Sequence, residues 1–175
     1  MYCTPLQLAD AKLSRELAQV ATPERFPIVT DALMEATLRG APRTAFPPAD
    51  VAIADEALAI ISGRLQEASD LIDGYLVMRK PVAYTVPLNP VPGIVATWTR
   101  WIARYLLHKD RVSTEERTDP VVRDYKEALK FLGLIRDGKF SLGADDPQPP
   151  PSAGSVEWVA PERQFTMDTL RGYGE

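Results

Sequence analysis

Four basic side chains recur on one side of a tryptophan-containing segment: Arg100, Arg104, His108 and Arg111. Their spacings of four, four and three residues put them on one face if this segment is a helix. A row of cations fits an acidic protein surface or the DNA backbone, and the alternative is a solvated face opposite a core-facing seam. Arg100, Arg104 and Arg111 are therefore candidates for contact with a neighbouring subunit or with DNA.

Residues that commonly carry catalysis are scarce. His108 is the single histidine and Cys3 the single cysteine, so a structural zinc site or a nucleophile with its base is not expected. We interpret His108 as a surface residue in the last turn of a helix. Glu67, Asp70 and Asp73 could hold a divalent ion, but their spacing is more typical of a solvated or ion-paired face. No phosphate-binding loop, dinucleotide-binding glycine pattern or HExxH motif occurs. The sequence predicts no catalytic residue, cofactor or metal site, and hence no enzyme.

Charge is distributed in blocks along the 175 residues. Residues 1–78 carry 6 basic and 11 acidic groups, residues 79–139 carry 12 and 7, and residues 140–175 carry 2 and 6. Such a chain can pair with itself or with copies of itself, while its net charge of −4 argues against tight general binding to nucleic acid. Since no signal peptide or membrane-spanning run is found, we expect a soluble protein from a reducing compartment.

The elements that must position these groups are mainly helices, because apolar residues recur at spacings of three and four. Thr4 followed by Pro5 is typical of a helix start, as is Asp119 followed by Pro120. Proline-rich connections separate the helices. The predicted helices cover residues 4–20, 28–38, 50–78, 92–108 and 119–137.

The longest pattern runs from Asp50 to Met78 and forms a heptad seam, which is typical of a helix packed lengthwise on others. The fold class predicted is therefore mainly α, a helical bundle built on one long helix and antiparallel partners. The seam comprises Ala54, Leu58, Ile61, Leu65, Ala68, Ile72 and Tyr75. Its expected partners are Trp98, Trp101, Tyr105, Tyr125, Leu129 and Leu132, and the tryptophan helix adds Ile94 to its own seam.

Helical periodicity ends after residue 140, and PQPPP at 147–151 is a stiff, extended spacer. The stretch beyond the spacer keeps several large apolar side chains, which a tail without function would rarely need. We predict a helical domain over 1–143 and an extended C-terminal arm over 144–175 that docks onto a partner; the alternative is an arm folded back on its own helices. The candidate docking residues are Trp158, Phe165, Met167, Leu170 and Tyr173.

Four blocks of this sequence resemble the head–tail adaptor (neck, head-completion) proteins of Mu-like phages and prophages. They are the opening MYCTPLQLAD, the segment SDLIDGYLVMRKPVAYTVPLNPVP, the pair WIARYLLHKD and VVRDYKEALKFLGLIRDGKFSLG, and the closing RQFTMDTLRGY. The likeness lies in their order and pattern over roughly two-thirds of the chain. Residues 23–48 are longer and richer in proline than the family's usual link. Region 21–49 is accordingly an atypical insertion, expected as a surface loop or a small subdomain.

The resemblance implies a structural role without enzymatic activity. Family members form a ring beneath the portal protein, and the next neck or tail protein, a stopper or terminator, attaches to that ring. Twelve copies match the twelve-subunit portal, and DNA passes through the lumen without sequence-specific binding. The resemblance places the protein in the virion neck, assembled in the host bacterial cytoplasm, with the C-terminal arm on the portal or a neighbouring adaptor. Alternatives are a stopper or tail terminator, which tend to be strand-rich, and a small DNA-binding regulator.

Overall fold

A computed structural model describes residues 1–109, 119–143 and 146–147 of the chain. These residues form a mainly α fold, and no strand occurs among them. The prediction of a helical bundle is confirmed. The elements are the 3₁₀-helix η1 (Pro5–Leu8) and the α-helices α1 (Ala11–Ala21), α2 (Asp31–Arg39), α3 (Pro48–Val77), α4 (Gly93–His108) and α5 (Pro120–Arg136).

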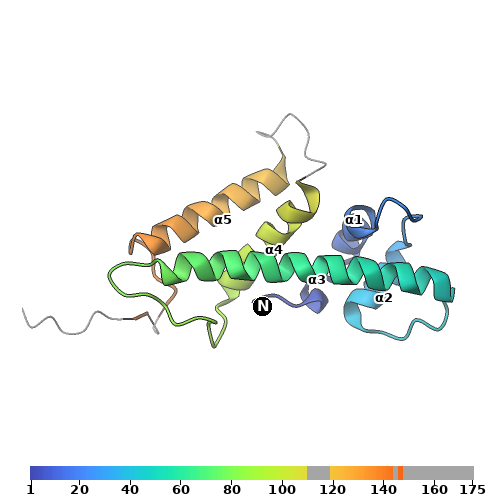
Figure 1. Cartoon of the computed structure of the whole chain (residues 1–175), viewed down its shortest axis with the longest axis horizontal. Coiled ribbons are helices and arrows are strands. Elements are labelled where there is room, and N and C mark those ends of the chain that lie inside the picture. The colour runs from blue at the N-terminus through green and yellow to red at the C-terminus, as the bar shows by residue number, and fades with distance from the viewer. Residues whose placement is uncertain (110–118, 144–145, 148–175) are drawn as a thin grey trace, which may run out of the picture.

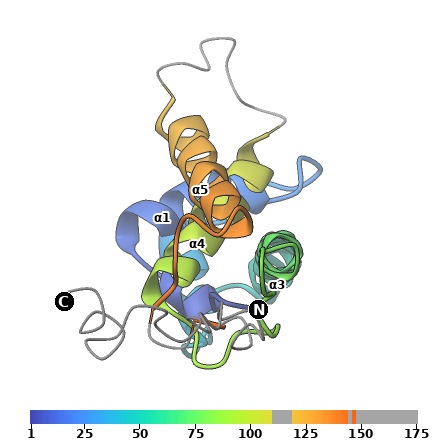
Figure 2. The ribbon, with the colours of Figure 1, turned by 90° about the vertical axis from the view of Figure 1, so that its left-hand side faces the viewer.

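The long helix α3 is the spine of the molecule. Helices α4 and α5 pack along its C-terminal half, and α1 and α2 pack near its N-terminal half (Figure 1). Helix α4 runs antiparallel to α3, whereas α5 returns in the same general direction as α3 (Figure 1). In the view along α3, these helices lie to one side of it (Figure 2). The described residues therefore leave the opposite side of α3 uncovered.

The buried seam of α3 differs from the predicted heptad at two positions. Leu58 and Tyr75 are only half-buried, whereas Ala57 and Leu76 are fully buried. From Ala54 to Leu76, successive buried positions are three, four, four, three, four and four residues apart, which is an eleven-residue repeat. Because this period is close to the natural turn of an α-helix, the helix does not need the left-handed supercoil of a heptad seam. The seam consists of Ala54, Ala57, Ile61, Leu65, Ala68, Ile72 and Leu76.

The predicted N-terminal helix is broken into η1 and α1. Asp10 adopts an extended backbone between them (φ −102°, ψ 144°), and the buried Leu8 and Ala9 precede it. The amide of Tyr2 donates to Ser69 Oγ of α3 at 3.0 Å. This long-range hydrogen bond and the burial of Leu8 are tertiary effects. The helix-start signal at Thr4 is local and cannot predict them.

Region 21–49 is part of the helical body rather than a loop throughout, because α2 lies within it. Thr30 caps α2 by accepting a hydrogen bond from the amide of Leu33. Gly40 ends the helix in the left-handed conformation (φ 64°). Met34 is fully buried and belongs to the hydrophobic core.

The buried face of α4 is rotated relative to the predicted seam. Ile94 is 43% exposed, and Trp101 and Tyr105 are half-buried. The rotation arises because α4 contacts α1, α3 and α5 and therefore buries more than one stripe. The fully or nearly fully buried residues of α4 are Val95, Trp98, Thr99, Ile102 and Ala103.

Aromatic contacts join α4 to α5. Trp98 stacks on Phe131 with ring centroids 5.8 Å apart, and Tyr105 stacks on Tyr125 at 3.9 Å. Asp119 caps α5 by accepting from the Val121 amide, which confirms the predicted helix start. Leu132 is buried as predicted, whereas Tyr125 and Leu129 are half-buried, and Ala128 and Ile135 are buried in addition.

Candidate functional site: a charge cluster and groove between α1 and α4

Two residues of the predicted basic stripe bind a carboxylate of the same chain. Arg104 on α4 donates from Nε and Nη2 to the two oxygens of Glu16 on α1, at 2.5 and 2.7 Å. His108 Nε2 lies 2.7 Å from Glu16 Oε1. All three side chains are 21–30% exposed. The two-pronged arginine–carboxylate geometry is the stronger kind of ion pair, so this cluster ties α1 to α4.

The environment of Glu16 favours its charged form. Burial alone would raise the pKa of this carboxyl, but the hydrogen bonds to His108 and Arg104 outweigh burial and lower the pKa to about 2. In the unfolded chain the pKa of this carboxyl is about 4.5. Its contribution to stability is therefore fully present above pH about 4.5 and is lost as the pH falls through about 2.

Replacing Glu16 with glutamine is expected to remove this part of the acid sensitivity. Wild-type unfolding free energy should fall between pH 4.5 and 2, and the fall should be shallower in the variant because the glutamine cannot be protonated. Chemical denaturation at a series of pH values measures the difference. Glu67→Gln is the control, because the Arg64–Glu67 pair is exposed and such pairs contribute little. Parallel pH profiles for wild type and Glu16→Gln would contradict this assignment.

Two residues of the predicted contact stripe have partners within the chain, and the contact role of the stripe stays a prediction. Arg104 is engaged within the chain, and His108, which lies in the last turn of α4 as predicted, is also a partner of Glu16. Arg100 is half-buried, donates to Thr97 Oγ at 3.3 Å, and forms no ion pair with any described carboxylate. Of the two stripe arginines that the structure describes, Arg104 has a carboxylate partner and Arg100 has none among the described residues.

Several predicted contact residues lie outside the described residues. These are Arg111 of the stripe and the arm residues Trp158, Phe165, Met167, Leu170 and Tyr173. Their assignment as contact residues therefore stays a prediction.

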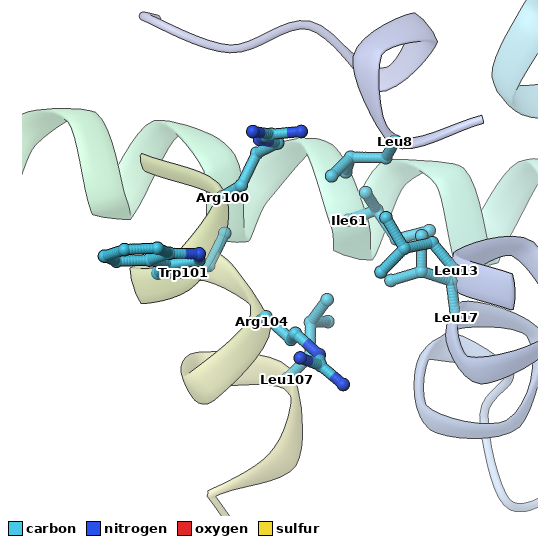
Figure 3. A pocket seen from close by; sticks show the side chains of 9 residues that line it. Leu8, Leu13, Leu17, Ile61, Arg100, Trp101, Arg104 and Leu107 are labelled. Carbon is cyan, nitrogen blue, oxygen red and sulfur yellow. The ribbon is translucent and has the colours of Figure 1, made fainter. Parts of the chain in front are cut away.

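An apolar groove adjoins the charge cluster. It has a cavity volume of about 180 Å³ and lies where the N-terminal segment, α3 and α4 meet (Figure 3). Arg100, Trp101 and Arg104 belong to the α4 side, and leucines of η1 and α1 form the opposite side (Figure 3). The lining residues are Leu8, Leu13, Leu17, Ile61, Arg100, Trp101, Ala103, Arg104 and Leu107. This combination of leucines and arginines suits a ligand that carries an apolar side chain next to a carboxylate.

A second cluster, which the sequence analysis missed, lies at the C-terminal end of α3. Arg79 pairs with Asp146 at 2.5 Å, and the two side chains are only 7% and 14% exposed. The Arg79 guanidinium also lies over the ring of Tyr84, 4.8 Å from its centroid, and the Tyr84 hydroxyl bonds to Asp146. These contacts fasten the segment after α5 to the connection between α3 and α4. The partners are 62 to 67 residues apart in the sequence, so no local spacing pattern predicts these contacts.

The opening of the chain docks beside the end of the same helix. The Tyr2 hydroxyl bonds to Asp73 of α3 and accepts from the Leu88 amide at 2.9 Å. Burial and the bond to Asp73 raise the pKa of Tyr2 to about 12. Two of the blocks that resemble the Mu-like proteins, the opening segment and the end of α3, are thus in direct contact.

The three carboxylates considered for metal binding have protein partners instead. Glu67 pairs with Arg64 at 2.6 Å, Asp70 accepts from Gln66 at 2.7 Å, and Asp73 binds Tyr2. Within the described ranges, no group of three or more metal-ligating side chains occurs.

Cys3 is 1% exposed, and burial raises the pKa of its thiol to about 11. The thiol is therefore protonated at neutral pH and a poor nucleophile.

A family model described as "Bacteriophage Mu, Gp36" matches residues 2–160. This chain belongs to the bacteriophage Mu Gp36 family. The matched region includes every described element, both charge clusters and the groove. The resemblance seen in the sequence blocks is confirmed at the level of the family.

Two curated relatives of this Gp36-family chain also come from Mu-like elements. The Mu-like prophage FluMu protein gp36 of Haemophilus influenzae is 36% identical over 88 residues, which cover 50% of this chain and 56% of the relative. Gene product J of Escherichia phage Mu is 30% identical over 104 residues, which cover 59% of this chain and 62% of the relative. The matches thus span less than two-thirds of either relative. No solved structure matches the chain significantly.

Within the part of the chain that the structure describes, no helix combines the length and apolar composition needed to cross a membrane. The long helix α3 carries a row of exposed acidic residues, including Asp55, Glu56, Glu67 and Asp70.

Proposed function

We propose that this protein is a head–tail adaptor, a non-enzymatic component of the phage neck. Copies form a ring beneath the portal protein, DNA passes through the lumen, and the next neck or tail protein attaches below. Twelve copies match a twelve-subunit portal. The site of action is the virion neck, after assembly in the bacterial cytoplasm. The observation that carries the proposal is the family match over residues 2–160, together with the sequence blocks that resemble neck proteins.

The shape of the subunit supports a ring. A helix of 30 residues is about 45 Å long, and the described helices pack on one side of α3 only (Figure 2). The rigid, uncovered side of α3 therefore offers a long surface to a neighbouring copy.

Charge on the exposed helix faces also supports contacts between copies. The exposed side of α3 carries Asp55, Glu56, Glu67 and Asp70, each of which stays exposed although it has a partner within the chain. The exposed side of α5 carries Arg123, Lys126, Lys130 and Arg136, of which Arg123 and Arg136 pair with adjacent aspartates. Opposite charges on different faces suit a head-to-tail contact, which closes into a ring when the rotation per subunit permits.

The two alternatives receive less support. Stoppers and tail terminators are expected to be strand-rich, and the described residues contain helices only. A DNA-binding regulator needs a row of available cations, whereas Arg104 and His108 are engaged by Glu16. The net charge of −4 further disfavours general DNA binding.

Co-sedimentation with purified portal particles tests the adaptor proposal. The protein should pellet with the portal and saturate at one copy per portal subunit, and it should remain in the supernatant without the portal. In parallel, the isolated protein should show no salt-dependent affinity for duplex DNA, since its net charge is −4. Failure to pellet with the portal, or tight salt-dependent binding to duplex DNA, would count against the adaptor role.

A further inference from the structure

The apolar groove between α1 and α4 is incompletely filled. Leu13, Trp101 and Leu107 line it and remain only half-buried. Arg100 lies on the α4 side of the same groove and pairs with no described carboxylate. The groove thus combines an uncovered apolar surface with a cation that lacks an acidic partner among the described residues.

The sequence beyond the last described residue offers a matching ligand. Residues 148–175 carry four acidic and two basic groups. In this stretch Glu157 directly precedes Trp158, so a carboxylate stands next to the largest apolar side chain. An indole in the groove would cover the half-buried leucines, and the adjacent carboxylate would reach the guanidinium of Arg100. Apolar burial and a charge-assisted hydrogen bond would then act together.

We propose that the groove of one copy binds the C-terminal segment of a second copy, with Trp158 in the groove and Glu157 on Arg100. This inference rests on the adaptor proposal, because a ring needs a repeating contact between copies. In this proposal the C-terminal arm docks onto the neighbouring adaptor rather than onto the portal.

The positions of the segment's origin and of the groove suit this exchange. Pro147 is held at the C-terminal end of α3 through its carbonyl, which accepts from Arg79 at 3.2 Å. The groove lies at Ile61, fifteen residues before Leu76, which is about 22 Å back along α3. Eleven residues separate Pro147 from Trp158, and a chain of that length can span at most about 36–40 Å. Since the donor and acceptor sites are at different places on the surface, the contact can repeat from copy to copy.

Two full-length variants with complementary defects test the exchange. Leu107→Glu places a charge in the groove and leaves the segment intact, whereas Trp158→Ala removes the anchor and leaves the groove intact. Sedimentation velocity over a range of concentrations should show self-association of the wild type, weakened at least tenfold in each variant. An equimolar mixture of the two should form a one-to-one dimer and nothing larger, because only one donor and one acceptor remain.

A charge exchange provides a second test that does not depend on Leu107. Arg100→Glu and Glu157→Arg should each weaken self-association, and the double variant should recover it. Circular dichroism should show unchanged helicity in every variant. A wild type that stays monomeric, variants that associate normally, a mixture without dimers, or no recovery in the double variant would each overturn the exchange. Wild-type pelleting with the portal would show separately whether the adaptor proposal stands.

Discussion

Replacing Ile61 with alanine is expected to lower the free energy of unfolding by about 2–5 kcal/mol. Ile61 is completely buried in the middle of α3 and belongs to the central core. It also lies at the floor of the groove between α1 and α4. Truncation removes apolar contacts and leaves a cavity, because the helices packed around α3 can relax only partly.

The adjacent residue supplies a matched control. Ile60 is 39% exposed, so Ile60→Ala deletes the same atoms from the same helix at a site that is partly in water. Its effect should be below about 1 kcal/mol. Chemical denaturation of both variants measures the difference. Equal effects, or a change within error for Ile61→Ala, would show that the seam of α3 does not face the core of its own chain.

Replacing Gly138 with alanine is the second change with a large expected effect, about 1–3 kcal/mol from the strained backbone alone. Gly138 has φ +70°, a conformation that residues with a Cβ rarely adopt. A Cβ built at this position would also lie 2.4 Å from the carbonyl oxygen of Lys80. That neighbour is backbone, and the Lys80 amide donates to the Arg136 carbonyl at 3.0 Å. The substitution should therefore push the connection after α3 away from the end of α5.

Gly133 is the control for Gly138. It lies inside α5, and a Cβ built there meets nothing within 4 Å beyond its chain neighbours and the backbone of its own helix. Gly133→Ala should stabilise the protein by up to about 1 kcal/mol, because alanine favours a helix more than glycine does. Thermal or chemical unfolding should move in opposite directions for the two variants. Similar shifts for both would mean that neither the positive φ nor the approach to Lys80 matters.

The helix boundaries could be predicted well where the signals are local. Asp119 before Pro120 predicts the start of α5 correctly, because a capping carboxylate acts on the adjacent backbone amides. The long helix was also predictable, since its apolar spacing persists over many turns. The eleven-residue seam is harder to recognise in the sequence. Leu58 and Tyr75 fit a heptad pattern that leaves out Ala57 and Leu76.

Tertiary contacts account for what the sequence did not reveal. The break at Asp10 follows from anchoring of Tyr2 on Ser69, 67 residues away. The predicted buried face of α4 is wrong at Ile94, Trp101 and Tyr105, because contact with three other helices buries more than one stripe of α4.

The candidate site shows the same limit. The basic spacing on α4 was identified correctly, but periodicity cannot show that Glu16 lies opposite Arg104, 88 residues away in sequence. Residue type and spacing therefore predict a row of cations that can contact a partner. In the fold, Arg104 of this row forms an ion pair within the chain. Arg100 could be singled out only after the structure had accounted for Arg104 and His108. The groove likewise depends on three segments that meet only in the folded chain.

Electron cryomicroscopy of this protein on purified portal particles tests the adaptor proposal most directly. The account predicts a closed ring on one end of the portal, with one copy per portal subunit. Each copy should show α3 as a rod of about 45 Å, with helical density on one side and the neighbouring copy on the other. A portal without added density, or copies bound singly without contact to one another, would contradict the account.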